Sequence, residues 1–409
     1  MKNLLLDTLR NNGSKNSDLF KCNGTVISYK TGIPPLDYYL GYKVNVYNKD
    51  DELIDSYPEI GIPAGSMVTF IGKPSTSKTS TAVTIAANIV RNFDNGLVIH
   101  FDLEQSMNMT RIATLSRMKM SEISNKYILR QERTTLEDMK STIISLYMEK
   151  TKNPEMYKYK TGKLNEFGEE IEIFEPTVII IDSIATITMG LNENDKKELA
   201  KLEEIGTQTD RMRLTGEIGR FFNEILPYLR TANIILLSIN QIKTNPNMGI
   251  VKSPAEILYL AQDEALPGGK APQFNASILI KFVAIGSEKY TLEDNGFDGF
   301  GTRAMIIKCR SNQAGQSVDL VYDKKRGVDA MRTTLAYAKQ MGLLGGNKNS
   351  TYFVDSKDVK WSMVHLHEEI RERPELIKHI FANTIPLLEK RLSTITDKEK
   401  EVFSDEFDY

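Results

Sequence analysis

The sequence predicts an α/β fold in which a mainly parallel sheet is covered by helices on both faces. Four continuous apolar runs alternate with helical segments and end in polar residues: 67–71, 96–102, 177–183 and 232–241. Runs that are apolar throughout are typical of strands buried on both faces of a parallel sheet. Ligands of such sheets bind at the carboxyl ends of the strands, so the polar tips of the runs mark the expected site.

The composition of the 409-residue chain is that of an ordinary globular protein, 41% hydrophobic and 26% charged. Its length favours two or three domains. The formal net charge of −2 excludes a strongly basic protein, so any contact with nucleic acid has to come from a local patch. Cys22 and Cys309 lack the spacing of metal ligands, which indicates a reducing cytosol. We expect neither a signal peptide nor a membrane span.

The residues before the first apolar run are predicted to form a short arm and the entry to a core domain. Residues 1–12 are predicted as a helix, followed by a linker that completes the segment 1–24. A helix this short is not stable alone, and docking on its own domain or on a neighbouring subunit are both open. The core domain is expected over residues 25–327, with an irregular stretch after residues 31–37.

The first apolar run leads into Gly72-Lys73-Pro74-Ser75-Thr76-Ser77-Lys78-Thr79-Ser80, and a buried helix is predicted after it. A strand, a tight loop ending in Lys-Thr and a helix form the context of a phosphate cradle, where backbone N–H groups face the phosphates. We expect Lys78 to reach the outer phosphates and the Thr79 hydroxyl to bind a magnesium ion. A surface turn rich in Lys, Ser and Thr is the alternative.

Ser77 departs from the usual form of this motif, which has glycine immediately before the lysine. Glycine is favoured where the backbone takes a positive φ. A serine at this position is therefore expected to cost stability unless the loop keeps an ordinary φ.

Three polar residues at strand ends are candidates for chemistry. Asp182 closes an apolar run and is the expected carboxylate behind the magnesium ion, or else a cap of the next helix. Glu104 follows the neighbouring run and is either a base that polarises a water beside a γ-phosphate or a surface charge. Gln241 ends the fourth run, where its amide can bind the γ-phosphate and report it to the following loop. An uncommitted turn residue is the alternative there.

Two long segments, residues 189–208 and 242–269, follow the third and fourth runs. Loops of more than about 15 residues without clear structure are usually functional or disordered. A helix with arginines on one face follows the first segment. Together these features suit a protein that binds nucleic acid under the control of ATP. The alternative is that the exposed arginines are simply solvated. The candidates for nucleic-acid contact are Arg213, Arg220, Lys243, Gly268 and Gly269.

The remaining segments carry no predicted chemistry. Residues 150–175, rich in Lys, Glu and Tyr, are predicted to form a surface hairpin. Residues 328–392 are predicted to form a small α/β domain, with a helix ending at residues 343–346, a short strand over 351–354 and then helices. Residues 393–409 are predicted to be a mobile acidic tail.

Six motifs, taken in order, resemble those of the RecA-family recombinases, in particular the bacteriophage UvsX-like recombinases. The resemblance covers about residues 24–392, and the serine before the lysine is similar to the phage branch. Each motif is modest alone, but the ordered set is highly specific. The motifs are Gly72–Thr79, Phe101-Asp102-Leu103-Glu104, Ile179-Ile180-Ile181-Asp182-Ser183, Ile239-Asn240-Gln241-Ile242, Pro267-Gly268-Gly269-Lys270-Ala271 and Ile307-Lys308-Cys309-Arg310.

The resemblance implies a RecA-like P-loop ATPase core that uses ATP and Mg²⁺, and it implies roles that spacing does not show. Glu104 would be the hydrolytic base, and Gln241 would link the γ-phosphate to the second DNA loop. Arg111 would stack on adenine with its planar guanidinium. Lys308 and Arg310 would reach the ATP of the next subunit and supply charge as an arginine finger does. A charge pair at a strand edge is the alternative for these two.

The resemblance also implies a function, that of an ATP-dependent DNA recombinase. Such a protein forms helical filaments on single-stranded DNA and exchanges strands with double-stranded DNA in recombination, repair and recombination-dependent replication. The two long segments would line the filament axis, the arm would dock on the next subunit, and the acidic tail would compete with DNA. A single-strand-binding protein and a recombination mediator are further implied partners, and the cytoplasm of a bacterial host is the implied location.

Two other functions remain open from the sequence. A ring-forming DNA helicase or motor ATPase would use the same core, although such enzymes normally carry a sizeable additional domain. A DNA-binding or scaffolding relative without catalysis is the other, in which Ser77 would have impaired hydrolysis.

Overall fold

The computed structural model describes residues 26–50, 52–187, 208–244, 259–260, 264–285 and 299–392. The predicted N-terminal helix, the first long segment up to residue 207, most of the second and the acidic tail lie outside these residues.

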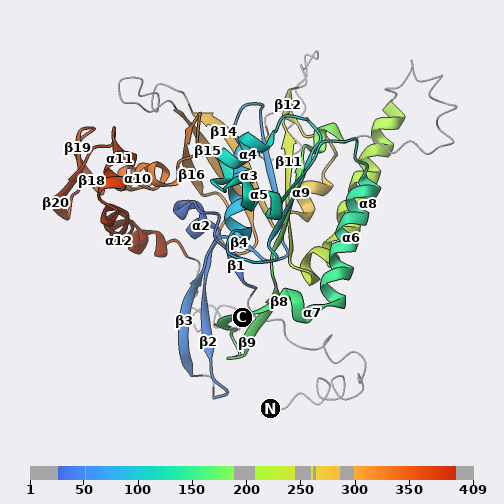
Figure 1. Cartoon of the computed structure of the whole chain (residues 1–409), viewed down its shortest axis with the longest axis horizontal. Helices are drawn as coiled ribbons and strands as arrows, with labels where there is room; N and C mark the ends of the chain where they lie inside the picture. The colour runs from blue at the N-terminus through green and yellow to red at the C-terminus, as the bar shows by residue number, and fades with distance from the viewer. Residues whose placement is uncertain are drawn as a thin grey trace, which may run out of the picture.

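A nine-stranded mixed sheet forms the centre of the described chain, in the order β17-β16-β15-β14-β5-β11-β10-β6-β7 (Figure 1). The strands from β14 to β7 run parallel, and β15, β16 and β17 continue the sheet antiparallel. The predicted α/β fold with a mainly parallel sheet is confirmed, and the four apolar runs form β5, β6, β10 and β11. The strands are β5 (Met67–Gly72), β6 (Leu97–Asp102), β7 (Tyr127–Arg130), β10 (Thr177–Asp182), β11 (Ile234–Gln241), β14 (Ile278–Ile285), β15 (Gly299–Cys309), β16 (Ser317–Asp323) and β17 (Gly327–Val328).

Helices cover both faces of the sheet because its central strands are apolar on both. Successive residues of a strand point to opposite faces, so Val178 and Ile180 join one core cluster while Ile179 and Ile181 join the other. On the first face lie α3 (Lys78–Val90), α4 (Met109–Ser116) and α5 (Met120–Lys126). On the second lie α6 (Leu136–Lys152) and α8 (Gln208–Thr231). No helix in the described ranges is both long and apolar enough to cross a bilayer.

The stretch after residues 31–37 is regular, which corrects the prediction of irregular structure. Helix α2 (Pro34–Leu40) begins at a proline, which suits the first turn because its missing N–H would be unpaired there anyway. A hairpin of β2 (Tyr42–Tyr47) and β3 (Leu53–Glu59) follows, and the short strands β1 (Ser28–Tyr29) and β4 (Ile62–Pro63) pair beside it. The alternation of Val44 and Val46 with polar residues is the signal that was overlooked.

The hairpin predicted within residues 150–175 is confirmed, but it begins later. Residues up to Lys152 complete α6, α7 (Pro154–Tyr157) follows, and β8 (Lys158–Leu164) then pairs with β9 (Glu170–Phe174). This hairpin packs against β2–β3, where the Tyr57 hydroxyl donates to the Leu164 carbonyl at 2.5 Å. Both hairpins project from the same end of the sheet (Figure 1).

The residues after β17 form a small α/β unit with its own core. A small C-terminal α/β domain was part of the predicted fold class. Its elements are α10 (Ala330–Gln340), β18 (Leu344–Asn347), β19 (Ser350–Phe353), β20 (Ser356–Trp361), α11 (Leu366–Glu372) and α12 (Glu375–Glu389). Phe353, Trp361 and Leu366 are buried at its centre. Two details of the prediction are wrong: residues 344–347 form a strand and not a helix end, and residues 356–361 form a third strand where a helix was expected. Gly342 takes φ +73°, which stops α10 before β18.

Candidate functional site

The loop between β5 and α3 closes around the side chain of Lys78. The Lys78 ammonium donates to the carbonyls of Gly72 at 3.0 Å and Lys73 at 2.7 Å. Burial lowers the pKa of Lys78 to about 8, and the carboxylates of Asp182 and Glu104 oppose that shift. A lysine in this setting remains mostly charged at pH 7, so it can pair with an anion that enters the loop.

The other residues of the predicted cradle form its floor and its rim. Gly72 and Thr76 are buried, whereas Lys73, Pro74 and Ser75 are exposed. A Cβ atom on Gly72 would lie 2.6 Å from the Phe282 carbonyl oxygen, so β14 leaves room for glycine only.

Ser77 has φ +66°, in the left-handed region, directly before the first residue of α3. The loop therefore does not keep an ordinary φ at this position, and we expect the serine to lower the stability of the folded protein. The Ser77 hydroxyl is also buried and has no hydrogen-bond partner among the described residues. The backbone at this position has the left-handed conformation that glycine adopts easily, and a serine in that conformation is strained.

Thr79 and Asp182 lie together, as the motif predicted. The Thr79 hydroxyl donates to Asp182 Oδ2 at 2.6 Å. Burial raises the pKa of Asp182 to about 7; the Thr79 hydrogen bond opposes this shift, and the nearby carboxylates of Glu104 and Asp102 add to it. A hydroxyl and a carboxylate oxygen in a buried acidic setting fit Mg²⁺, which prefers oxygen ligands and would offset the crowded negative charge.

Glu104, which follows β6, and Gln241, which ends β11, are also brought together at the carboxyl ends of two strands that flank β10. Gln241 Nε2 donates to Glu104 Oε1 at 2.6 Å, and the Ser183 hydroxyl donates to the same oxygen at 2.6 Å. Because both donors reach Oε1, they fix the rotation of the carboxylate. Gln241 pairs in register with Gly72, so this carboxylate lies beside the cradle. The arrangement can hold and polarise a water at the edge of the loop.

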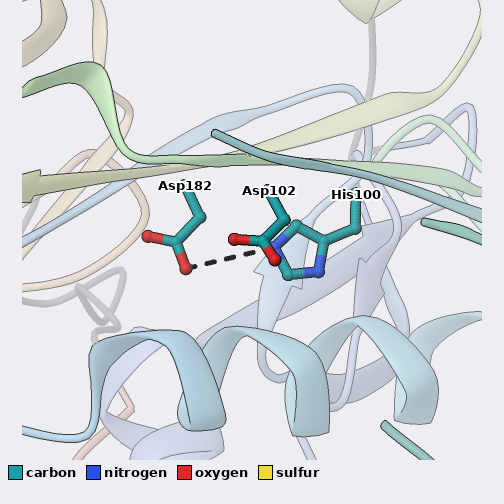
Figure 2. Close-up of side chains that lie close together, drawn as sticks. All are labelled: His100, Asp102 and Asp182. Carbon is teal, nitrogen blue, oxygen red and sulfur yellow. Dashed lines mark ion pairs between the residues drawn. The ribbon is translucent and has the colours of Figure 1, made fainter. Parts of the chain in front are cut away.

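The Asp182 carboxylate belongs to a cluster of three buried side chains (Figure 2). Their potential ligand atoms lie within 4.8 Å of one another, and the three residues are His100, Asp102 and Asp182. Asp102 accepts hydrogen bonds from the backbone of Ser106 at 3.1 Å and of Met107 at 2.9 Å, so its role is structural. We therefore assign no separate metal site to this cluster.

His100 connects this cluster to Tyr127. Its Nδ1 lies 2.8 Å from the Tyr127 hydroxyl, and its Nε2 lies 4.0 Å from Asp182 Oδ2 (Figure 2). Burial lowers the pKa of His100 to about 4, with Asp102 opposing, so the ring is neutral at pH 7. Burial also raises the pKa of Tyr127, which keeps its hydroxyl as a donor. The ring thus lies between Tyr127 on one side and Asp182 on the other.

Arg111, the residue expected to contact adenine, lies in α4 against the turn between β16 and β17. Its guanidinium donates to the Lys325 carbonyl at 3.0 Å and to the Tyr322 hydroxyl at 3.3 Å. Burial raises the pKa of Tyr322, and the Ser80 side chain in the first turn of α3 opposes that shift. Arg111 is thereby held beside the helix that follows the cradle, but its partners are protein groups and its role stays a prediction.

The base of the second long segment lies at the same edge of the sheet. Its two ends pair as β12 (Lys243–Thr244) and β13 (Glu264–Ala265). Gly268 and Gly269 take φ +79° and +74°. Cβ atoms there would lie 2.8 Å from a methyl of Ile184 and 2.6 Å from one of Thr215, so the glycines permit close packing. The segment itself lies mostly outside the described residues, and DNA contacts of Lys243 and these glycines stay predictions.

Arg213 and Arg220 are both exposed on α8. Arg220 donates to Glu224 Oε1 at 2.9 Å, and Glu224 also accepts from Lys140 at 2.6 Å. The charge of Arg220 is thus partly neutralised on its own surface, which weakens it as a candidate for DNA contact.

Lys308 and Arg310 lie near the amino ends of the parallel strands, whereas the cradle lies at their carboxyl ends. Lys308 pairs with Leu279, which pairs with Thr69 near the start of β5, whereas the cradle follows Gly72 at its end. The structure therefore does not bring these two residues to the site of their own chain. A role at a nucleotide would require a second copy of the protein.

The local surroundings of this pair are polar. The Lys308 ammonium donates at 2.8 Å to the carbonyl of Phe274, in the short helix α9 (Ala271–Asn275). Burial lowers the pKa of Lys308, and Arg310 adds to that shift. Arg310 also lines a cavity of about 590 Å³, together with Arg230.

Sequence reasoning missed four residues of the site. Ser183 follows a residue that was singled out, so its position was an available signal. His100, Glu264 and Tyr322 lie on three separate strands, β6, β13 and β16, and their partners are distant in sequence.

Comparisons with known proteins add little. No protein-family model matches the chain, and no curated protein matches it. Among solved structures, the chain is similar to one described as the crystal structure of the RadB recombinase, with 16% identity and a TM-score of 0.38 over 66% of this chain and 92% of that one. A likeness of this strength assigns neither a fold nor a function.

Proposed function

We propose that the protein is an ATP-dependent DNA recombinase that forms helical filaments on single-stranded DNA and carries out homologous pairing and strand exchange. ATP binding and hydrolysis are supported by one observation: five side chains lie together at the carboxyl ends of the parallel strands. They are Lys78, Thr79, Asp182, Glu104 and Gln241. The order of sequence motifs supports the recombinase part. The same motifs, with Ser77 in place of glycine, favour the UvsX-like branch.

In this proposal each residue has a defined task. Backbone N–H groups of the cradle and the Lys78 ammonium hold the phosphates of ATP. Thr79 and Asp182 hold Mg²⁺, which neutralises charge on the phosphate oxygens. Glu104, oriented by Ser183 and Gln241, takes a proton from the attacking water.

Gln241 has a second task, because the next residues begin the stem of the 242–269 segment, which is the strand pair β12–β13 with the residues beside it. A γ-phosphate near Glu104 competes for the Gln241 amide, so hydrolysis changes the contact that holds the stem. The nucleotide thus controls DNA affinity through this residue.

The test is DNA-stimulated hydrolysis of ATP in the parent and in Lys78→Ala. We expect single-stranded DNA to raise turnover in the parent and Lys78→Ala to lose nearly all of it, because the cradle loses its phosphate-binding charge. Equal turnover in the two proteins would exclude catalysis at this site and favour a non-catalytic DNA-binding protein.

Electron micrographs test the assembly. With single-stranded DNA and a non-hydrolysable ATP analogue we expect helical filaments on the DNA. Rings, together with strand unwinding, would instead identify a helicase or motor ATPase.

A further inference from the structure

One carboxylate, that of Glu264, joins the stem of the 242–269 segment to the cradle. Glu264 Oε1 lies 3.4 Å from the ammonium of Lys73, the second residue of the cradle motif, and Oε2 lies 3.3 Å from that of Lys281 on β14. The Glu264 side chain is 8% exposed and that of Lys73 is 61% exposed. The acid is therefore fixed in the protein, while the lysine is the partner that can move.

Packing holds Glu264 in place. Lys281 also donates to the carbonyl of Tyr259 at 2.8 Å, and the strand that carries Glu264 pairs with Lys243–Thr244. The apolar side chains of the stem pack on the strand that enters the cradle; this cluster comprises Ile71, Ile242, Leu260 and Leu279. The stem thus meets the site at two separate points, Gln241 at Glu104 and Glu264 at Lys73.

We propose that Glu264 holds the Lys73 ammonium in an ion pair while the cradle is empty, and that nucleotide phosphates in the cradle draw Lys73 away from it. Filling the cradle thereby changes the contacts of the stem. The inference rests on the proposed function, because it takes a nucleoside triphosphate as the ligand. Phosphates in the cradle carry several negative charges near residue 73, and one ammonium cannot pair fully with both them and Glu264. By linkage, a polynucleotide held by the segment changes nucleotide affinity by the same factor.

Two simpler roles of Glu264 make different predictions. A carboxylate that only repels phosphates through space would weaken nucleotide binding whether or not Lys73 is present. A carboxylate that only fastens the stem to Lys281 would leave nucleotide affinity independent of Lys73.

A double-mutant cycle with full-length protein separates these roles. The affinity for a fluorescent, non-hydrolysable ATP analogue with Mg²⁺ is measured in the parent, Glu264→Gln, Lys73→Met and the double variant. We expect Glu264→Gln to tighten binding roughly two- to fivefold when Lys73 is present, the range for a solvent-exposed ion pair. We expect no gain in the Lys73→Met background. An equal gain in both backgrounds, or no gain in either, overturns the inference.

Controls keep the cycle interpretable. Glu172 forms a similar pair with Lys158 on the β8–β9 hairpin, away from the cradle, so Glu172→Gln should leave nucleotide affinity unchanged. Circular dichroism checks that each variant is folded. Lys73→Met changes an exposed side chain, so we expect it to fold. If Glu264→Gln does not fold, Glu264→Asp, whose carboxylate reaches less far toward Lys73, takes its place in the same cycle.

Binding of single-stranded DNA with and without the analogue distinguishes failure of the inference from failure of the proposed function. If the parent binds DNA in a nucleotide-dependent way, Glu264→Gln should reduce that dependence by the factor found in the cycle. If the parent binds the nucleotide but no DNA, the recombinase proposal fails and the cycle still decides the role of Glu264. A parent that binds no nucleotide overturns both.

Discussion

The serine before Lys78 occupies a backbone conformation that suits glycine, at φ +66°, and its hydroxyl is buried without a partner among the described residues. A left-handed conformation costs a non-glycine residue about 1–2 kcal/mol, although glycine loses more entropy on folding. We expect Ser77→Gly to raise the free energy of unfolding by about 1 kcal/mol, measured by urea denaturation. Ser77→Ala, which removes only the hydroxyl, should recover less. A less stable Ser77→Gly protein would contradict this account.

His100 is expected to orient the carboxylate of Asp182, since its Nε2 faces that group while Tyr127 holds the other ring nitrogen. Loss of such an indirect partner typically lowers metal affinity 10- to 100-fold. We predict that His100→Leu raises the Mg²⁺ concentration needed for binding of an ATP analogue by about tenfold. His100→Gln keeps a polar side chain and should restore part of the affinity. An unchanged Mg²⁺ requirement in His100→Leu would show that the ring only fills space.

At the scale of single residues, the sequence predicted what depends on near neighbours in the chain. Lys78 and Thr79 follow directly from the order of strand, loop and helix. Asp182 and Gln241 follow from being polar tips of buried runs. Ser183 and Tyr322 were missed because their contacts join residues 79 and 211 positions apart, and no local pattern encodes such a distance.

At the scale of elements, Lys150 connects α6 to the sheet. Its ammonium is buried and donates to the carbonyls of Glu175 at 2.6 Å and Ala232 at 3.0 Å, just before β10 and β11 begin. Burial lowers the pKa of Lys150 to about 7, against the opposing effect of Glu175. The unfolded chain therefore binds more protons than the folded protein between about pH 7 and pH 10, and stability rises with pH across that window.

Replacing this lysine tests that sign. Lys150→Met removes the titration, although it leaves the two carbonyls without their donor. We expect the stability of the parent relative to the variant to increase by about 2–3 kcal/mol from pH 7 to pH 10, measured by urea denaturation at each pH. Lys152→Met, at an exposed position of the same helix, is the matched control and should keep the pH dependence of the parent. A parent and Lys150→Met that respond identically to pH would contradict the burial of this charge.

Elements were predictable where the pattern was strong. The four apolar runs gave the central parallel strands to within two residues at their starts, because burial on both faces leaves an unmistakable composition. The β2–β3 hairpin and β20 were missed, because each is a half-exposed strand in which polar residues outnumber buried ones. The antiparallel extension of the sheet by β15 and β16 depends on pairing across the chain, which periodicity does not give.

At the scale of the whole molecule, the two groups of proposed catalytic residues lie at opposite ends of the parallel strands. Lys78, Glu104 and Gln241 lie at the carboxyl ends of the parallel strands, and Lys308 lies at the other end. Both groups can act on one nucleotide only if a head-to-tail interface places Lys308 of one copy beside the cradle of the next. Repetition of such an interface generates a ring or a helical filament.

Mixing two inactive variants tests whether the site is shared. Lys78→Ala lacks the cradle charge and Lys308→Ala lacks the charge at the far edge, so we expect each alone to lose DNA-stimulated hydrolysis. In a mixed assembly, an interface that joins an intact cradle to an intact Lys308 restores one complete site. For equal amounts and random order, about a quarter of the interfaces are complete, so turnover should recover to about that fraction of the parent. Full turnover by Lys308→Ala alone, or no recovery on mixing, would place the complete site within a single copy.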